Sequence, residues 1–113
     1  MQLELLKTEF GISRLESSAP IPEWATGEFA SITRTSEELS IVCEGRGFRC
    51  LKVDGPLDFS LVGILSSLAG ALARAKVPIF AISTFDTDYI FFANEHLDGA
   101  IRALEGDGHV VRR

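Results

Sequence analysis

The sequence predicts an α+β fold in which an antiparallel sheet carries helices on one face. Three observations lead to this prediction. The length, 113 residues, suits one compact domain or two small fused units. The second half of the chain alternates strand and helix patterns, and the first half is rich in strand patterns only. The composition, 46% apolar and 24% charged, is that of an ordinary globular protein.

The first elements of the second half are a strand and a long helix. Residues 49–53 alternate in hydropathy and precede a turn at Gly55. Asp58 is a suitable N-cap for a helix of about 16 residues, judged by apolar residues at steps of three and four: Leu61, Ile64, Leu65, Leu68, Leu72 and Ala75. Small residues, among them Gly63, fall on the opposite face. They favour either a neighbouring helix or a ligand that approaches the helix backbone.

A hairpin and a second helix are expected next. Residues 79–83 and 89–93 are apolar strand patterns joined by a polar turn at 84–88. Asn94 is a suitable N-cap for the helix that follows, and Gly106 is a suitable end for it.

A short strand at Val110 and Val111 completes the second half. The order over residues 48–111 is therefore strand, helix, strand, strand, helix, strand. This order predicts the ferredoxin-like arrangement, a four-stranded antiparallel sheet with two helices on one face. The arrangement serves many functions and by itself indicates none.

The first half reads as a shortened copy of the second. Four strands are expected, at 3–6, 10–15, 29–33 and 40–43. Residues 29–35 align with 80–86, and each segment ends a strand in threonine before an acidic stretch and another strand. This similarity predicts a degenerate duplication, with a shortened unit over 1–46 and a complete unit over 47–113. Trp24 is expected to fill the core of the first half.

Charge and hydropathy exclude several classes of protein. The formal net charge of −5 and the lack of a basic cluster argue against nucleic acid as a partner. Polar residues interrupt the longest apolar stretch, 59–77, and Glu4 and Lys7 interrupt the first apolar run, so we expect neither a membrane span nor a signal peptide. A cytoplasmic protein is the expectation, and Cys43 and Cys50 are then reduced thiols.

No catalytic residues and no cofactor are expected. His96 and His109 have no recognisable catalytic neighbour, and Cys43 is more typical of a structural thiol than of a nucleophile. The glycines at 45 and 47 are too closely spaced for a phosphate-binding loop and precede a strand.

The hairpin turn carries the residues with binding chemistry. Asp86 and Asp88 flank Thr87, and this pattern suits a ligand amine, a hard metal ion or an ordinary turn. A metal usually recruits more oxygens than two neighbouring carboxylates offer, so no metal site is predicted. Phe85 is apolar within this polar turn, and it either covers a ligand or packs against the long helix or a partner chain.

These segments resemble the small bacterial ACT domain proteins. The most specific stretch is ISTFDTDYI at 82–90, preceded by VDGPLDFS at 53–60, and SITRT at 31–35 and ELSIV at 38–42 contribute. Such proteins are similar in turn to the CASTOR-type arginine sensors, which carry tandem ACT units. The resemblance spans nearly the whole chain, and it implies an ACT-like unit over 47–113 and a shortened ACT-like copy over 1–46.

The resemblance implies a non-catalytic regulatory module that binds an amino acid at an interface between ACT units. By position it nominates five ligand-binding residues: Gly63, Thr84, Phe85, Thr87 and Asp88. Thr87 stands where the arginine sensors tend to have an aromatic residue, and Leu61 where they have an acid, so the identity of the amino acid stays open. A homodimer is expected. The alternative is a structural dimerisation domain that binds no ligand.

Overall fold

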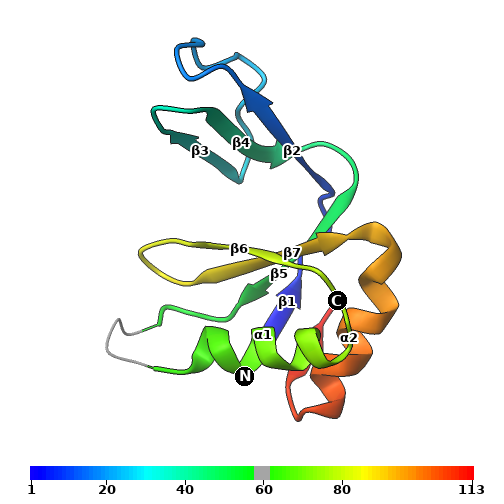
Figure 1. The fold of residues 1–113 in the computed structure, drawn as a ribbon. Coiled ribbons are helices and arrows are strands. Elements are labelled where there is room, and N and C mark those ends of the chain that lie inside the picture. Colours follow the sequence, from blue (N-terminus) through cyan, green and yellow to red (C-terminus); the bar gives the residue numbers. More distant parts are fainter. Residues whose placement is uncertain (58–61) are drawn as a thin grey trace. The chain divides into compact units, whose positions relative to one another are not determined.

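The structure, a computed structural model, describes residues 1–57 and 62–113 (Figure 1). Its elements in chain order are β1 (Gln2–Leu5), β2 (Phe10–Leu15), β3 (Ala30–Arg34), β4 (Leu39–Glu44), β5 (Phe48–Val53), α1 (Ile64–Arg74), β6 (Phe80–Ser83), β7 (Asp88–Ala93), the 3-10 turn Asn94–His96, α2 (Leu97–Gly106) and β8 (Val110–Arg112). The chain forms two compact units. The larger unit comprises Met1–Lys7 and Phe48–Arg113, and the smaller unit comprises Thr8–Gly47.

The larger unit confirms the α+β, ferredoxin-like class and the predicted order of its elements. Its strands pair in the order β6, β7, β5, β1, β8. The structure corrects the expected sheet in one respect. β1 lies between β5 and β8, antiparallel to β5 and parallel to β8, so the sheet is neither four-stranded nor wholly antiparallel. The central position of β1 buries its apolar side chains, because Leu3 and Leu5 are 0% and 8% exposed in the core of this unit.

Both helices pack on the same face of this sheet (Figure 1). One continuous cluster joins buried side chains of α1 and α2 to those of the strands: Leu51, Val53, Leu68, Leu72, Ile90, Phe92, Ala100, Ile101, Leu104 and Val111. Successive strand residues point to opposite faces, so the alternating positions of β5 and β7 supply this core. Each large side chain buried in this way contributes about 1.5 to 3 kcal/mol.

Helix α1 begins later than the apolar pattern predicts. It runs for 11 residues from Ile64, and Gly63 occupies its N-cap position with a φ of 79°. A right-handed helix cannot run through the left-handed backbone of Gly63. The expectation of one helix that includes Gly63 is therefore wrong. The first helical bond runs from the Ser67 amide to the Gly63 carbonyl over 2.8 Å. Asp58 and Leu61 lie outside the described residues.

The smaller unit is a three-stranded antiparallel sheet in the order β3, β4, β2. Leu39, Ile41 and Cys43 of β4 form its core together with Ala25. The expectation that Trp24 fills this core is wrong. Trp24 is 52% exposed, whereas Ala25, the next residue, is buried.

The division of the chain differs from the expected 1–46 and 47–113. The break at Gly47 and Phe48 lies within one residue of the expected one, but Met1–Lys7 groups with the larger unit because β1 pairs with β5 and β8. The duplication itself stays a prediction. Among the described residues, no helix is long and apolar enough to cross a membrane.

Candidate functional site

A cavity of about 290 Å³ opens in the larger unit between the start of α1 and the turn that joins β6 to β7. All five residues nominated from the sequence line it: Gly63, Thr84, Phe85, Thr87 and Asp88. The lining also includes Leu57, Ile64, Leu65, Ser66, Ser83 and Asp86. Residues from three separate segments of the chain therefore meet at one hollow.

The turn on one side of the cavity is held by its own threonines. The Thr84 amide donates to the Thr87 carbonyl over 2.8 Å, and the Thr84 hydroxyl donates to the same carbonyl over 3.1 Å. The Thr87 amide lies 3.3 Å from the Thr84 hydroxyl oxygen, which accepts from it. These bonds close the turn and fix the direction of the side chains beside it.

Thr87 is a buried residue that links the turn to the sheet. Its side chain is 3% exposed, and its hydroxyl donates to the Val53 carbonyl over 2.7 Å. A buried polar group of this kind is normally paired, and here the partner is the backbone of β5. This bond holds the turn against β5, and the hydroxyl proton of Thr87 is already used in it.

The loop after β5 forms the adjoining wall. The Leu57 amide donates to the Asp86 carbonyl over 2.7 Å. A β-carbon on Gly55 would lie 3.0 Å from both the Asp86 carbonyl oxygen and the Thr87 β-carbon, closer than ordinary contact. Glycine at this position permits the loop and the turn to approach each other.

A further wall of the cavity is the first turn of α1. The amides of Ile64, Leu65 and Ser66 precede the first helical bond, and Gly63 at the N-cap has no side chain with which to cap them. The N-terminal amides of a helix and the positive end of its dipole together suit an anion such as a carboxylate. A β-carbon on Gly63 would meet nothing within 4 Å, so the glycine is required for its backbone conformation and not for room.

Two carboxylates line the same cavity as the first turn of α1. The Asp88 side chain is half-buried, and the Ser83 hydroxyl donates to its Oδ1 over 2.5 Å. Asp86 is exposed at the cavity mouth. The cavity therefore combines a helix N-terminus, which attracts anions, with carboxylates, which attract cations, and an α-amino acid zwitterion carries a group suited to each.

Phe85 lies at the rim. Its side chain is 80% exposed, so it is not buried against α1 as one of the interpretations required.

Sequence reasoning missed Ser66 and Ser83 as parts of the site. Ser66 falls in the first helical turn, and its role depends on where α1 begins. Ser83 pairs with Asp88 across the β6–β7 hairpin, and this register places its hydroxyl on the carboxylate. Ser83 could have been predicted only from the exact register of the hairpin, which pairs it with Asp88.

Among residues 1–57 and 62–113, no group of three or more His, Cys, Asp or Glu residues is placed to hold a metal ion. The buried Cys43 thiol lies 3.8 Å from the Trp24 carbonyl, and burial, followed by the charge of Glu44, raises its pKa. Burial is also the main reason that the pKa of His109 is lowered.

We expect Cys50 to be unreactive in the folded protein. It is 0% exposed, and burial raises its pKa to about 12, so almost no thiolate, the reactive form, exists at pH 8. A thiol reagent should label Cys50 only after denaturation, with no reductant needed. Because the folded pKa is raised, this burial stabilises the fold below the unfolded pKa of about 9 and loses that effect as the pH rises toward 12. Rapid labelling of the native protein at Cys50, located by mass spectrometry, would contradict this.

The fold and the cavity define a small α+β module suited to binding a small ligand. A sequence profile of the ACT domain family matches residues 44–106, which is more than half of the chain, so the chain belongs to the ACT domain family. A second profile, described as an N-terminal domain, matches residues 8–46. ACT domains are in general regulatory modules that bind small molecules, and they commonly oligomerise.

Two solved structures share the fold. A protein from Agobacterium tumefaciens is 37% identical over 97% of this chain and 90% of its own, with a TM-score of 0.90. A Vibrio cholerae protein of unknown function, described as a possible transport protein, is 20% identical over 94% of this chain and 88% of its own, with a TM-score of 0.76. The second likeness concerns the fold alone.

Proposed function

We propose that this chain is a non-catalytic sensor module that binds an α-amino acid in the cavity between α1 and the β6–β7 turn. The observation that carries the proposal is that the start of α1 and the Asp88 carboxylate line the same cavity. The first amides of α1 receive the ligand carboxylate, and Asp88 receives its ammonium group.

The surrounding residues support the proposal by fixing the turn that carries Asp88. Ser83 holds the Asp88 carboxylate in place, and Thr87 anchors the turn to β5. Preorganised groups of this kind bind a ligand without first losing their own freedom. Membership of a family whose domains are generally regulatory agrees with a sensor and not an enzyme.

The proposal includes a cytoplasmic homodimer in which ACT units meet near the ligand, as in the CASTOR-type sensors that the sequence resembles. The exposed Phe85 at the rim is consistent with a site that a second surface covers. The rival proposal is a dimerisation domain with an empty cavity, and a binding measurement separates the two.

We expect Asp88→Asn to weaken amino acid binding by about tenfold, the lower end of the range for a charge-assisted contact, because the site is partly open. Asparagine keeps the size of the side chain and can still accept from Ser83, so the fold should be preserved. A thermal-shift screen of the standard amino acids identifies the ligand, since only one that prefers the folded state raises the melting temperature. Calorimetry then measures its affinity.

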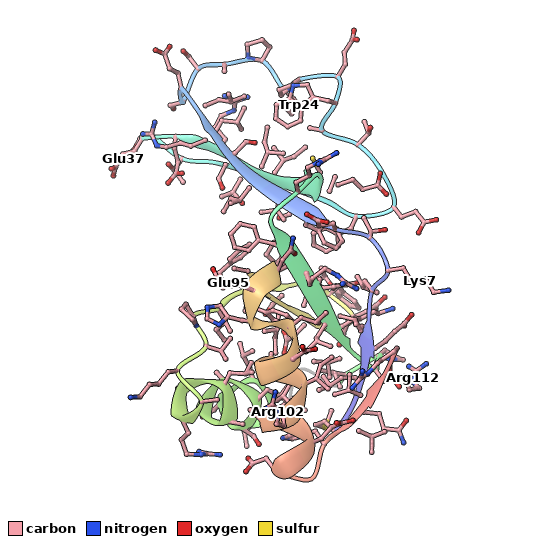
Figure 2. All side chains as sticks on the ribbon, turned by 90° about the vertical axis from the view of Figure 1, so that its right-hand side faces the viewer. Lys7, Trp24, Glu37, Glu95, Arg102 and Arg112 are labelled. Atoms are coloured by element: carbon pink, nitrogen blue, oxygen red, sulfur yellow. The ribbon has the colours of Figure 1, made fainter. Side chains whose placement is uncertain are left out.

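Glu37→Gln is the matched control. Glu37 is an exposed acid in the smaller unit (Figure 2), and it does not line the cavity. The same change of charge there should leave affinity unaltered. Equal binding by Asp88→Asn and the parent protein would show that the ligand lies elsewhere, and failure of every amino acid to bind would favour the rival.

A further inference from the structure

We infer that the smaller unit carries a protein-binding surface, which docks a basic segment of a partner protein beside Trp24. This surface, called the Trp24 surface below, consists of Ile21, Glu23, Trp24, Glu28 and Glu44. All five residues belong to the smaller unit, so the inference does not depend on the proposed amino acid site in the larger one.

The negative charge of the chain is concentrated in the smaller unit. Residues 8–47 contain seven glutamates and three arginines, whereas the rest of the chain contains nine acidic and eight basic residues. The smaller unit therefore carries −4 of the formal net charge of −5. No lysine or arginine occurs between Arg14 and Arg34, the stretch that contains most of the Trp24 surface. A surface of this sign attracts a cationic partner and repels an anionic one.

The two arginines that flank this stretch are bound to the backbone. Arg14 donates to the Glu37 carbonyl over 2.8 Å, and Arg34 donates to the Ser17 carbonyl. Within the described part of the chain, no ion pair involves a carboxylate of the Trp24 surface. These carboxylates are exposed, so a cation from outside the chain has access to them.

Trp24 and Ile21 give the surface an apolar centre, because both are exposed to solvent over more than half of their area. Ile32 of β3 extends this centre. It lies opposite Ile41, whose side chain packs with Ala25, so Ile32 is on the side of the sheet that the 16–29 loop covers. An accessible tryptophan is a frequent centre of binding energy in protein interfaces, and its ring face also receives arginine and lysine.

The loop that presents Trp24 is held in place by the smaller unit itself. Ala25 is buried in the core, and its amide donates to the Pro22 carbonyl over 3.1 Å. A β-carbon on Gly27 would lie 3.5 Å from the carboxyl carbon of Glu44, so this side chain borders the same loop. A surface fixed in this way loses little conformational freedom when a partner binds.

These features define the chemistry of the partner. Its cationic groups meet the three carboxylates, and an apolar side chain beside them packs on Trp24 and Ile21. An exposed segment with arginine or lysine next to an apolar residue meets both requirements. A second copy of the smaller unit brings the same negative charge, and like charges at an interface are unfavourable.

Tryptophan fluorescence tests the inference, because Trp24 is the only tryptophan of the chain and so reports on this surface. We expect a synthetic peptide of alternating arginine and leucine to change the emission of the intact protein. The same peptide with glutamine in place of arginine should leave the emission unchanged. Higher ionic strength should weaken the binding, since salt screens exposed charges. Absence of binding at about 1 mM of the arginine peptide would overturn the inference.

A pair of substitutions locates the binding. Glu23→Gln combined with Glu28→Gln should weaken the affinity for the arginine peptide by about fivefold, the size of two exposed ion pairs. The matched control combines Glu95→Gln with Glu105→Gln, which changes two exposed acids of the larger unit and should leave the affinity unaltered. Equal weakening by both pairs would show that the peptide responds to net charge alone, and the inference would be wrong.

Trp24→Ala tests the apolar centre. It should lower the affinity for the arginine peptide, now measured by calorimetry, by more than about tenfold, as expected for the central residue of an interface. Far-ultraviolet circular dichroism identical to that of the parent protein shows that the fold is kept. If Trp24→Ala binds the peptide as tightly as the parent protein, the docking surface does not include Trp24 and the inference is overturned.

Discussion

Leu3→Ala is expected to destabilise the larger unit by about 2 to 5 kcal/mol, the usual cost of removing a fully buried leucine side chain. Leu3 is 0% exposed, lies opposite Val53 of β5 and Val111 of β8, and belongs to the core that α1 and α2 cover. The truncation leaves a cavity in the centre of the sheet. Chemical denaturation followed by far-ultraviolet circular dichroism measures the loss.

Hydrogen exchange shows where the loss falls. Because β1 bridges β5 and β8, the amides of those two strands should exchange faster in Leu3→Ala. Leu39→Ala is the matched variant, since Leu39 is also 0% exposed but belongs to the core of the smaller unit. Its faster exchange should fall in β2, β3 and β4. If Leu3→Ala instead loosened β2 to β4 and left β5 and β8 protected, the assignment of Met1–Lys7 to the larger unit would be wrong.

The placement of β1 illustrates what the sequence could not supply. Alternating leucines at 3 and 5 predict a strand with one buried face, and the structure confirms that strand. Alternation says nothing about which strand lies alongside, because pairing between distant segments depends on the whole sheet. The order of the elements in 48–111 was predictable because each one is a local pattern.

The start of α1 was missed for a related reason. Apolar residues at helical spacing continue on both sides of Gly63, and spacing alone cannot distinguish a glycine within a helix from one that precedes it. The φ of 79° decides the matter. Trp24 was expected in the core of the smaller unit, but tryptophan is often only partly buried, and here Ala25 is the buried residue of the pair.

The sequence brought the candidate residues together but did not give the role of each one, and the binding site itself stays a prediction. The family resemblance nominated five residues, and all five line one cavity. The inward bond of Thr87 and the bond from Ser83 to Asp88 depend on the register of β6 with β7 and on the approach of the turn to β5. Such contacts join segments that the sequence leaves far apart.

Thr87→Val is the second substitution with a large expected effect, and it tests this account of the wall. Valine has nearly the shape of threonine but cannot donate to the Val53 carbonyl. Loss of a buried hydrogen bond in which one partner remains costs about 1 to 3 kcal/mol, so the unfolding free energy should fall by that amount. Denaturation in urea measures it.

Thr33→Val is the control for the chemistry of the change. Thr33 is an exposed residue of β3, so the same substitution there should alter stability by less than about 0.5 kcal/mol. In Thr87→Val the Leu57 amide, which donates to the Asp86 carbonyl, should also exchange faster, because the turn is no longer tied to β5. If Thr87→Val were as mild as Thr33→Val and Leu57 stayed protected, the buried hydroxyl would not be what holds the turn, and the geometry of Asp86 and Asp88 would depend on the hairpin alone.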